Sequence, residues 1–171
     1  LFYSTQYATI ENLTITNYCG SYEYFSSSVI YSKPKNSATC PRLNNCIIAG
    51  CYDEKSNYGA RPVANGGVFT RCLFVANRCT SRAPQMGGAF IQLYDCVFRG
   101  NYGNTIIGRG SDGEAYNSII VSNCVFDANK VPAMSCGGKV SDCIFTNNVA
   151  ASWDGFVNAA LLLAVNNSFF Y

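Results

Sequence analysis

One short phrase recurs along the chain, and this repeat limits the possible folds more than any other feature of the sequence. Its consensus is Asn, Asp or Arg, then Cys, an aliphatic residue, Phe, any residue, a small residue and Asn. Five copies occupy residues 45–51, 71–77, 95–101, 123–129 and 142–148, and degenerate relatives occupy residues 12–18 and 167–171. Successive repeat cysteines are 26, 24, 28 and 19 residues apart. A period in the twenties with variable insertions predicts a solenoid whose coils differ mainly in loop length.

The local composition indicates which kind of solenoid to expect. The phrase is rich in Val, Ile and Phe and is bounded by Gly and Asn, which is typical of strands joined by turns. A second apolar block follows Gly-Gly pairs at residues 66–67, 87–88 and 137–138. No coil contains a helical periodicity long enough for the return arm of a leucine-rich repeat. The sequence therefore predicts an all-β fold, a parallel β-helix, as a single domain over residues 1–171.

The phrase also predicts which side chains stack inside the coils. Cys and Phe are two residues apart, so they share one face of a strand, and equivalent residues of successive coils lie about 4.8 Å apart. The predicted core consists of Cys46, Cys72, Cys96, Cys124, Cys143, Phe74, Phe98, Phe126 and Phe145. The last Asn suits a bend, because Asn tolerates left-handed geometry and its amide can bond to its counterpart one coil away. The predicted turn ladder is Asn77, Asn101, Asn129 and Asn148.

The repeat resembles a known family. Cys-x-Phe-x-x-Asn followed by Gly-Gly-Ala, at residues 72–77 and 87–89, is similar to the polymorphic outer-membrane protein repeats of bacterial autotransporter passengers. More widely, residues 10–171 resemble the right-handed, pectate-lyase-like β-helix superfamily. The resemblance implies a right-handed parallel β-helix of about six to seven coils. Proteins with this fold include adhesins, surface fibres, phage tailspikes and polysaccharide lyases or hydrolases, so the motif specifies a scaffold and not a reaction.

Two features depart from that family pattern, namely the irregular spacing and the hydrophobic residue between Cys and Phe. This residue is expected to point outward, where such repeats often carry a small polar side chain. The predicted apolar stripe is Ile47, Leu73, Val97, Val125, Ile144 and Phe169. One interpretation of this stripe is the ordinary β-propensity of aliphatic residues at half-covered positions. The other is a contact surface for a loop, another protomer or a neighbouring fibre.

The chain contains ten cysteines, which favours an oxidising compartment. The cysteines of the core either fill space as small apolar side chains or form disulfides between coils. Cys19, Cys40, Cys51, Cys79 and Cys136 lie outside that file, and we expect Cys19 with Cys40 and Cys51 with Cys79 as candidate disulfides. The absence of histidine and of any CxxC pair argues against a metal site, so no cofactor is expected.

Composition excludes several classes of function. With 49% hydrophobic and 13% charged residues and a net charge of +2, the chain is neither disordered nor a binder of nucleic acid. Without histidine, it cannot contain a Ser-His-Asp triad or a Cys-His pair. The longest apolar run, residues 156–165, is shorter than the ~20 residues of a membrane helix, so no membrane insertion is expected.

The acidic residues do not point to catalysis. Asp95 and Asp142 share one repeat position two coils apart, which is a turn-forming position first. Asp112 and Glu114 beside Arg109 form the best acidic cluster, yet they are typical of a solvated loop. Loop tyrosines either stack on sugars or cover coil ends. We therefore expect no catalytic residue.

These observations predict a non-catalytic, extracellular structural or adhesive protein in a surface fibre or filament. The expected partners are copies of itself, neighbouring fibre segments, glycans or cell surfaces, with residues 21–39 and 103–116 as recognition loops. Both ends of the sequence look unfinished, which favours a longer fibre or end-to-end stacking. Sequons at Asn12 and Asn166 are candidate glycosylation sites. The alternative is a carbohydrate-active β-helix domain, a polysaccharide lyase or hydrolase.

Overall fold

A computed structural model describes residues 2–4, 7–20, 28–32, 39–53, 62–79, 85–108, 119–131, 133–134, 138–149, 164–166 and 169–170. This part of the chain is all-β and contains no α-helix, and its strands form three sheets in which every pairing is parallel. The prediction of an all-β fold with parallel strands is therefore confirmed.

The three sheets take successive segments of each repeat. The first sheet contains β1 (Phe2–Ser4), β5 (Ile30–Ser32), β9 (Ala64–Thr70), β12 (Met86–Tyr94), β15 (Ile119–Ser122), β17 (Lys139–Ser141) and β19 (Ala164–Asn166). It also contains β6 (Arg42–Asn44), which pairs with β9, and β2 (Thr9–Glu11), which pairs with β6. The second contains β3 (Thr14–Thr16), β7 (Ile47–Ala49), β10 (Leu73–Val75), β13 (Val97–Arg99), β16 (Val125–Asp127), β18 (Ile144–Thr146) and β20 (Phe169–Phe170). The third contains β4 (Cys19–Gly20), β8 (Tyr52–Asp53), β11 (Arg78–Cys79) and β14 (Tyr102–Gly103).

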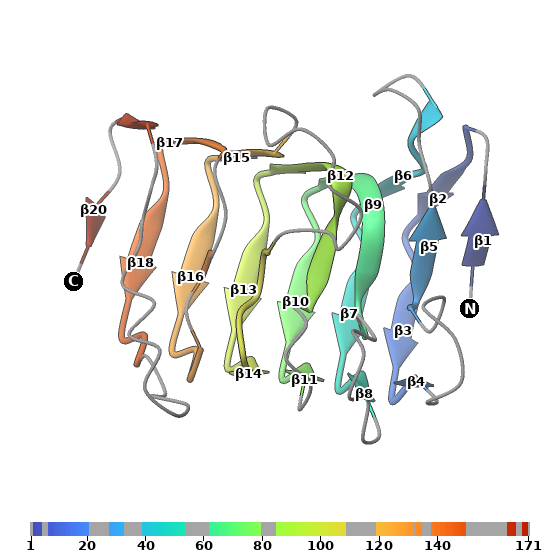
Figure 1. Cartoon of the computed structure of the whole chain (residues 1–171), viewed down its shortest axis with the longest axis horizontal. Coiled ribbons are helices and arrows are strands. Elements are labelled where there is room, and N and C mark those ends of the chain that lie inside the picture. Colours follow the sequence, from blue (N-terminus) through green and yellow to red (C-terminus); the bar gives the residue numbers. More distant parts are fainter. Residues whose placement is uncertain are drawn as a thin grey trace.

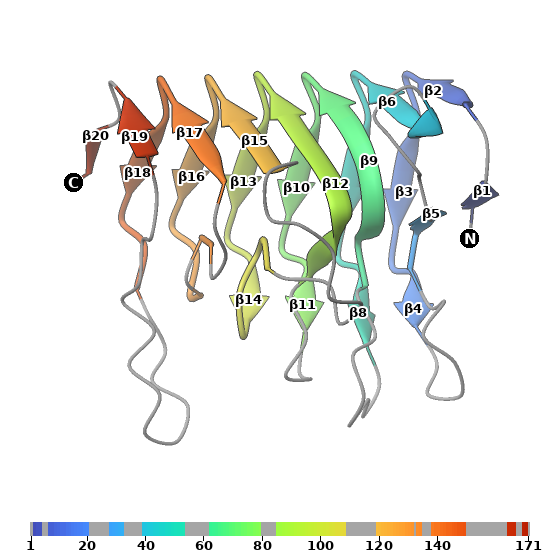
Figure 2. The ribbon, with the colours of Figure 1, turned by 45° about the horizontal axis from the view of Figure 1, so that its top comes forward.

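Each strand pairs with its counterpart in the next copy of the repeat. In the second sheet the strands follow chain order from β3 to β20, and they stand side by side across Figure 1. Figure 2 shows the first sheet running along the same direction, with the third sheet at the opposite edge. Parallel neighbours require the chain to cross over between them. These pairings are compatible with a parallel β-solenoid.

Left-handed backbone turns separate the sheets at two columns of corners. The residue before the Cys position has a φ of 53 to 56° in six copies, and it is Asn12, Asn45, Arg71, Asp95, Asn123 or Asp142. The second column lies one residue before the final Asn position and consists of Asn17, Gly50, Ala76, Gly100, Ala128 and Asn147. The left-handed residue is therefore not the final Asn, as we expected, but its predecessor. The final Asn side chain is thereby turned inward and not out over the bend.

Stacked aromatic rings form one file of the core. Phe74, Phe98, Phe126 and Phe145 lie in register on adjacent strands of the second sheet. Their ring centroids are 4.6, 4.7 and 4.9 Å apart, and the planes of neighbouring rings differ by only 4 to 6°. Ile48 and Ile15 occupy the same position in the two preceding copies. Burial of these rings with like above like gives the second sheet a continuous apolar interior.

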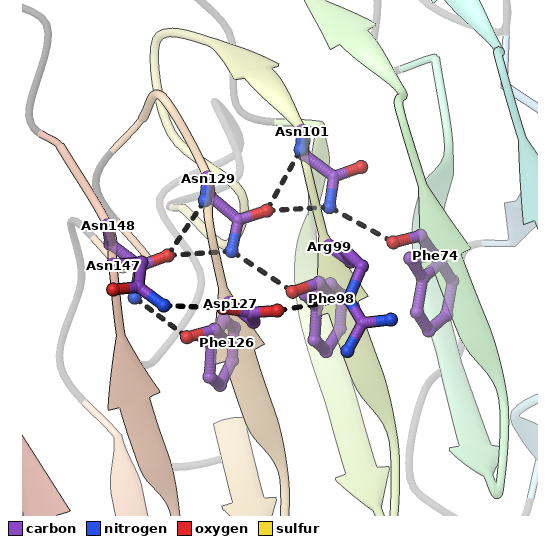
Figure 3. Close-up of polar contacts among 9 residues, drawn as sticks. All are labelled: Phe74, Phe98, Arg99, Asn101, Phe126, Asp127, Asn129, Asn147 and Asn148. Atoms are coloured by element: carbon purple, nitrogen blue, oxygen red, sulfur yellow. Dashed lines mark hydrogen bonds and ion pairs between the residues drawn. The ribbon is translucent and has the colours of Figure 1, made fainter.

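A ladder of buried amides lies beside the aromatic file. The backbone N–H groups of Asn77, Asn101 and Asn129 each donate to the side-chain Oδ1 of the asparagine in the next copy, at 2.9 to 3.0 Å. Each Nδ2 in turn donates to a carbonyl oxygen of the preceding copy, for example Asn129 to Phe98 at 3.1 Å and Asn148 to Phe126 at 2.7 Å (Figure 3). The amides therefore satisfy backbone groups that the corner would otherwise leave unpaired.

A further buried column was not anticipated. Ile30, Ala64, Met86, Ile107 and Met134 lie in register, and all are buried. Ile30 and Ile107 fall within residues 21–39 and 103–116, which we expected to be exposed recognition loops. Residues 21–27, 33–38 and 109–116 lie outside the described part. Residues 28–32 and 105–108 are buried and therefore belong to the interior and not to an exposed loop.

We predict that Phe126→Ala destabilises the protein by about 3–5 kcal/mol, because a fully buried ring in the middle of the file is lost and a cavity remains. Its neighbour Val125 points outward, so Val125→Thr, which keeps β-propensity, should cost less than about 1 kcal/mol. Urea unfolding followed by far-UV circular dichroism measures both values. Equal costs for the two variants would contradict the inward stacking of Phe126.

We predict that Asn129→Asp destabilises the protein by about 2–4 kcal/mol, because a carboxylate cannot donate to the Phe98 carbonyl or to Asn148. The matched control is Asn45→Asp at an exposed corner, where copies of the repeat already carry aspartate, and it should cost less than about 1 kcal/mol. The same unfolding measurement compares the two. If both substitutions were equally tolerated, the amide ladder would not contribute to stability.

Candidate functional site

The outward face of the second sheet carries the apolar stripe expected from the sequence. Ile47, Leu73, Val97, Val125 and Ile144 lie in register on adjacent strands. Ile47 and Ile144 are 38% and 42% exposed, and the three residues between them are half-buried. Phe169 pairs with Ile144 through the backbone, and its side chain lies outside the described part. Thr14 holds this position in the first copy, so the stripe begins at Ile47.

A second column runs beside the stripe on the same face. The companion column consists of Ala49, Val75, Arg99, Asp127 and Thr146, each two residues after its stripe residue. Arg99 and Asp127 form an ion pair with an Nε–Oδ2 distance of 3.0 Å. Asn147 donates to the other oxygen of Asp127 at 3.2 Å. The face is thus mainly apolar, with one charged pair near its middle.

A shallow depression of about 390 Å³ lies at the N-terminal end of the stripe. Ile47, Leu73 and Thr14 contribute apolar and hydroxyl groups, and corner residues including Asn45 and Arg71 line it with amide and guanidinium groups. The lining residues include no carboxylate and no histidine.

Polar side chains hold the corner beside this depression. Arg71 Nη2 donates to Asn44 Oδ1 at 2.9 Å, and Asn44 Nδ2 donates to Glu11 Oε1 at 3.1 Å. Asn45 Nδ2 donates to Oδ1 of Asn12, the exposed residue of the first sequon, at 2.8 Å. We did not single out Arg71, Asn44 or Asn45 from the sequence. Asn45 and Arg71 are the polar residues that begin their phrases, a position that we had assigned only to turn formation, and Asn44 directly precedes one of them.

The five repeat cysteines are buried thiols. Each thiol lies 3.1 to 3.4 Å from the carbonyl oxygen two residues before it, and it is a possible donor to that oxygen. Hydrogen bonding to the next thiol in the file, followed by burial, raises the pKa of Cys72 above its usual range and that of Cys96 and Cys124 to about 12. Such thiols stay protonated at neutral pH, so they are poor nucleophiles.

The last thiol of the file differs from the others. The Cys143 sulfur accepts hydrogen bonds from the Cys124 thiol and, at 3.4 Å, from the Cys124 backbone N–H, and the first of these is the main cause of its lowered pKa. Its side chain is fully buried, so the structure offers it no route to a substrate.

The expected disulfides are absent from the described residues, in which all nine cysteines are free thiols. Register explains the failure of the Cys51–Cys79 pairing, because Arg78 pairs with Tyr52 and therefore places Cys79 opposite Asp53. The Cys79 thiol lies 3.7 Å from Asp53 Oδ2. Cys19 lies in β4 of the third sheet, whereas Cys40 precedes β6 of the first sheet. Cys136 lies outside the described residues.

Of the remaining candidate site residues, some lie at corners and the others lie outside the described part of the chain. Asp95 and Asp142 are exposed corner residues with positive φ, and Asp95 Oδ1 accepts the Asn123 amide at 2.6 Å. Arg109, Asp112 and Glu114 lie outside the described part of the chain. Asn166 ends β19, and its side chain is likewise not described.

The described residues show neither a metal-binding cluster nor a membrane-spanning helix. They contain no group of three or more Cys, Asp or Glu side chains that could hold a metal ion. Within the same ranges, no helix has the length and hydrophobicity needed to cross a membrane.

Tyrosine and cationic residues alternate on the outward side of the third sheet. Tyr52, Arg78, Tyr102 and Lys130 lie in register, and the Arg78 guanidinium carbon is 5.6 Å from the centroid of the Tyr102 ring. This contact covers one ring face with the cation.

Comparison of the chain with protein-family models, curated proteins and solved structures finds no match.

Proposed function

We propose that the chain is a right-handed parallel β-helix of six to seven coils that acts as a non-catalytic structural or adhesive element outside the cell. The observation that carries this proposal is the in-register stacking of Phe and Asn side chains through successive copies of the repeat. Stacked repeats of this kind make a stiff scaffold in which each unit contacts mainly its neighbours, while loop lengths vary freely.

The proposed role requires no catalytic centre, and the chemistry of the described side chains agrees with that. The file thiols are buried, and the corner aspartates Asp95 and Asp142 support left-handed turns. The depression at Asn45 and Arg71 offers donors and an apolar floor but no general base. These features favour contact with a partner over turnover of a substrate.

The extracellular position and the place in a fibre or filament rest on the repeat. Its resemblance to autotransporter passenger repeats supports a surface location, and the exposed apolar stripe supports contact with another copy or a neighbouring segment. Glycans or cell surfaces are further partners under this proposal.

The second candidate is a carbohydrate-active β-helix domain. The depression favours it, because guanidinium, amide and hydroxyl groups above an apolar floor suit a sugar. Appearance of new reducing ends or unsaturated sugars when polysaccharides are incubated with the chain would favour this candidate and overturn the non-catalytic role.

We predict that duplication of one complete repeat, residues 96–123, gives a folded protein with a higher urea midpoint. The inserted copy adds one more ring to the Phe file and one more rung to the Asn ladder, and each added interface stabilises its neighbours. Unfolding curves measured by circular dichroism compare the duplicated chain with the original chain.

The matched control inserts a Gly/Ser sequence of equal length after Asn123, which adds chain without adding stacking. It should leave the midpoint unchanged or lower it. If the two insertions had the same effect, the chain would not be a stack of equivalent repeats.

We predict that antibodies against the chain label intact cells of its source. The extracellular assignment requires epitopes on the outer surface, so permeabilisation should not be needed. Immunogold electron microscopy measures the labelling, with a cytosolic protein as the control. Labelling that depends on permeabilisation would contradict the assignment.

A further inference from the structure

The outward face of the second sheet consists of two columns, the apolar stripe and the companion column. From β7 to β18, the two columns contain one charged pair, Arg99 and Asp127, and one hydroxyl residue, Thr146. All other residues of the two columns in this range are apolar. Stripe residues at both ends of this range, Ile47 and Ile144, rank among the exposed large hydrophobic side chains. A continuous apolar surface of this kind is typical of a protein-binding face.

The two charges lie on adjacent strands near the middle of the face. Arg99 is on β13 and Asp127 is on β16, and the Arg99 side chain is 62% exposed. Arg99 uses Nε for the bond to Asp127, and its Nη nitrogens have no hydrogen-bond partner among the described residues (Figure 3). A guanidinium with unused donors can therefore bind a second carboxylate.

We propose that this face binds a second copy of the chain, face to face, about a two-fold axis that runs parallel to the strands between β13 and β16. This operation reverses the order of the strands but keeps their direction. Each Arg99 then faces Asp127 of the partner subunit, Val97 faces its Val125, and Leu73 faces its Ile144. The inference rests on the proposed function, because it identifies the partner of the scaffold.

Charge placement selects this axis over the other two-fold axis that joins the same faces. An axis perpendicular to the strands keeps the strand order but exchanges the two columns. It would place Arg99 against Val97 and Asp127 against Val125 of the partner subunit, so both charges would be buried against apolar side chains. Both axes leave the Arg99–Asp127 pair within each chain. Only the proposed axis also brings an opposite charge of the partner subunit against each member of that pair, whereas the other axis buries the pair against apolar side chains.

The size of the face sets the expected strength of the dimer. About this axis the four strands from β10 to β18 face one another, and at about 4.8 Å per strand they give a contact about 15 Å long. This contact is smaller than a standard interface, which buries about 800 Å² on each partner. We therefore expect a reversible dimer that forms at high protein concentration.

The test uses two variants that separate contacts within a chain from contacts between chains. Arg99→Asp leaves two carboxylates on the face, and Asp127→Arg leaves two guanidinium groups. Each variant alone should dimerise at least about tenfold more weakly than the original chain, because like charges face each other across the interface. An equimolar mixture should dimerise again, because opposite charges then face each other between the two variants although neither variant has an internal pair. Sedimentation velocity over a range of concentrations measures these states.

Two further variants complete the experiment. Arg78→Asp makes the same change of charge on the third sheet and should leave dimerisation unaltered. Val125→Thr makes the stripe more polar without changing its charge and should weaken dimerisation. A folded original chain that stays monomeric at every concentration, or a mixture of folded variants that stays monomeric, would overturn the inference. Failure of the repeat duplication would instead count against the scaffold, so the two failures are distinguishable.

Discussion

In-register parallel pairing is the constraint on which the rest of this structure depends. Because each strand of the second sheet pairs with the same segment of the next copy, equivalent side chains come to lie directly above one another. A residue type that packs well at one position therefore packs well at the same position of the next copy, as the evenly spaced rings from Phe74 to Phe145 illustrate. A residue type that packs poorly would be equally unfavourable in every copy, and this explains why each buried position of the phrase contains few residue types.

The asparagine ladder shows why a polar residue belongs in this interior. A corner leaves backbone N–H and carbonyl groups that no strand partner satisfies. The amide of Asn101 accepts from the Asn77 backbone and donates to the Phe74 carbonyl and to Asn129, so one side chain serves both neighbours. Alanine offers neither function and aspartate lacks the donors. The left-handed residue before each Asn turns the amide inward, and Gly and Asn suit that conformation. Ala76 and Ala128 adopt it although alanine has no such preference.

Because successive side chains of a strand point to opposite faces, the residues that stabilise the fold differ from those that can contact a partner. Side chains at Cys and Phe positions point inward and fix the scaffold, whereas the residues between and after them point outward and are free to serve a partner. The stripe and the Arg99–Asp127 pair belong to this outward set. A change at Val125 or Arg99 can therefore alter assembly without altering the core, which is why the proposed dimer is testable in folded variants.

The sequence by itself determined the repeat, its strand character and the inward direction of the Cys and Phe side chains, because Cys-x-Phe is a local pattern of period two. The inward direction of the final Asn was not predicted, because it depends on the left-handed residue before it. Register was also predictable, since like positions stack in any parallel array. The buried column of Ile30, Met86, Ile107 and Met134 required the tertiary structure, because its members stand at irregular distances from the phrase and share no consensus. The thiol pairs likewise depended on register, since Cys79 lies opposite Asp53, which is two residues after Cys51. Arg99 and Asp127 hold the same position in successive copies, so the repeat makes them neighbours, but only the tertiary structure showed that their charged groups meet at 3.0 Å, because that distance depends on how the two side chains are oriented.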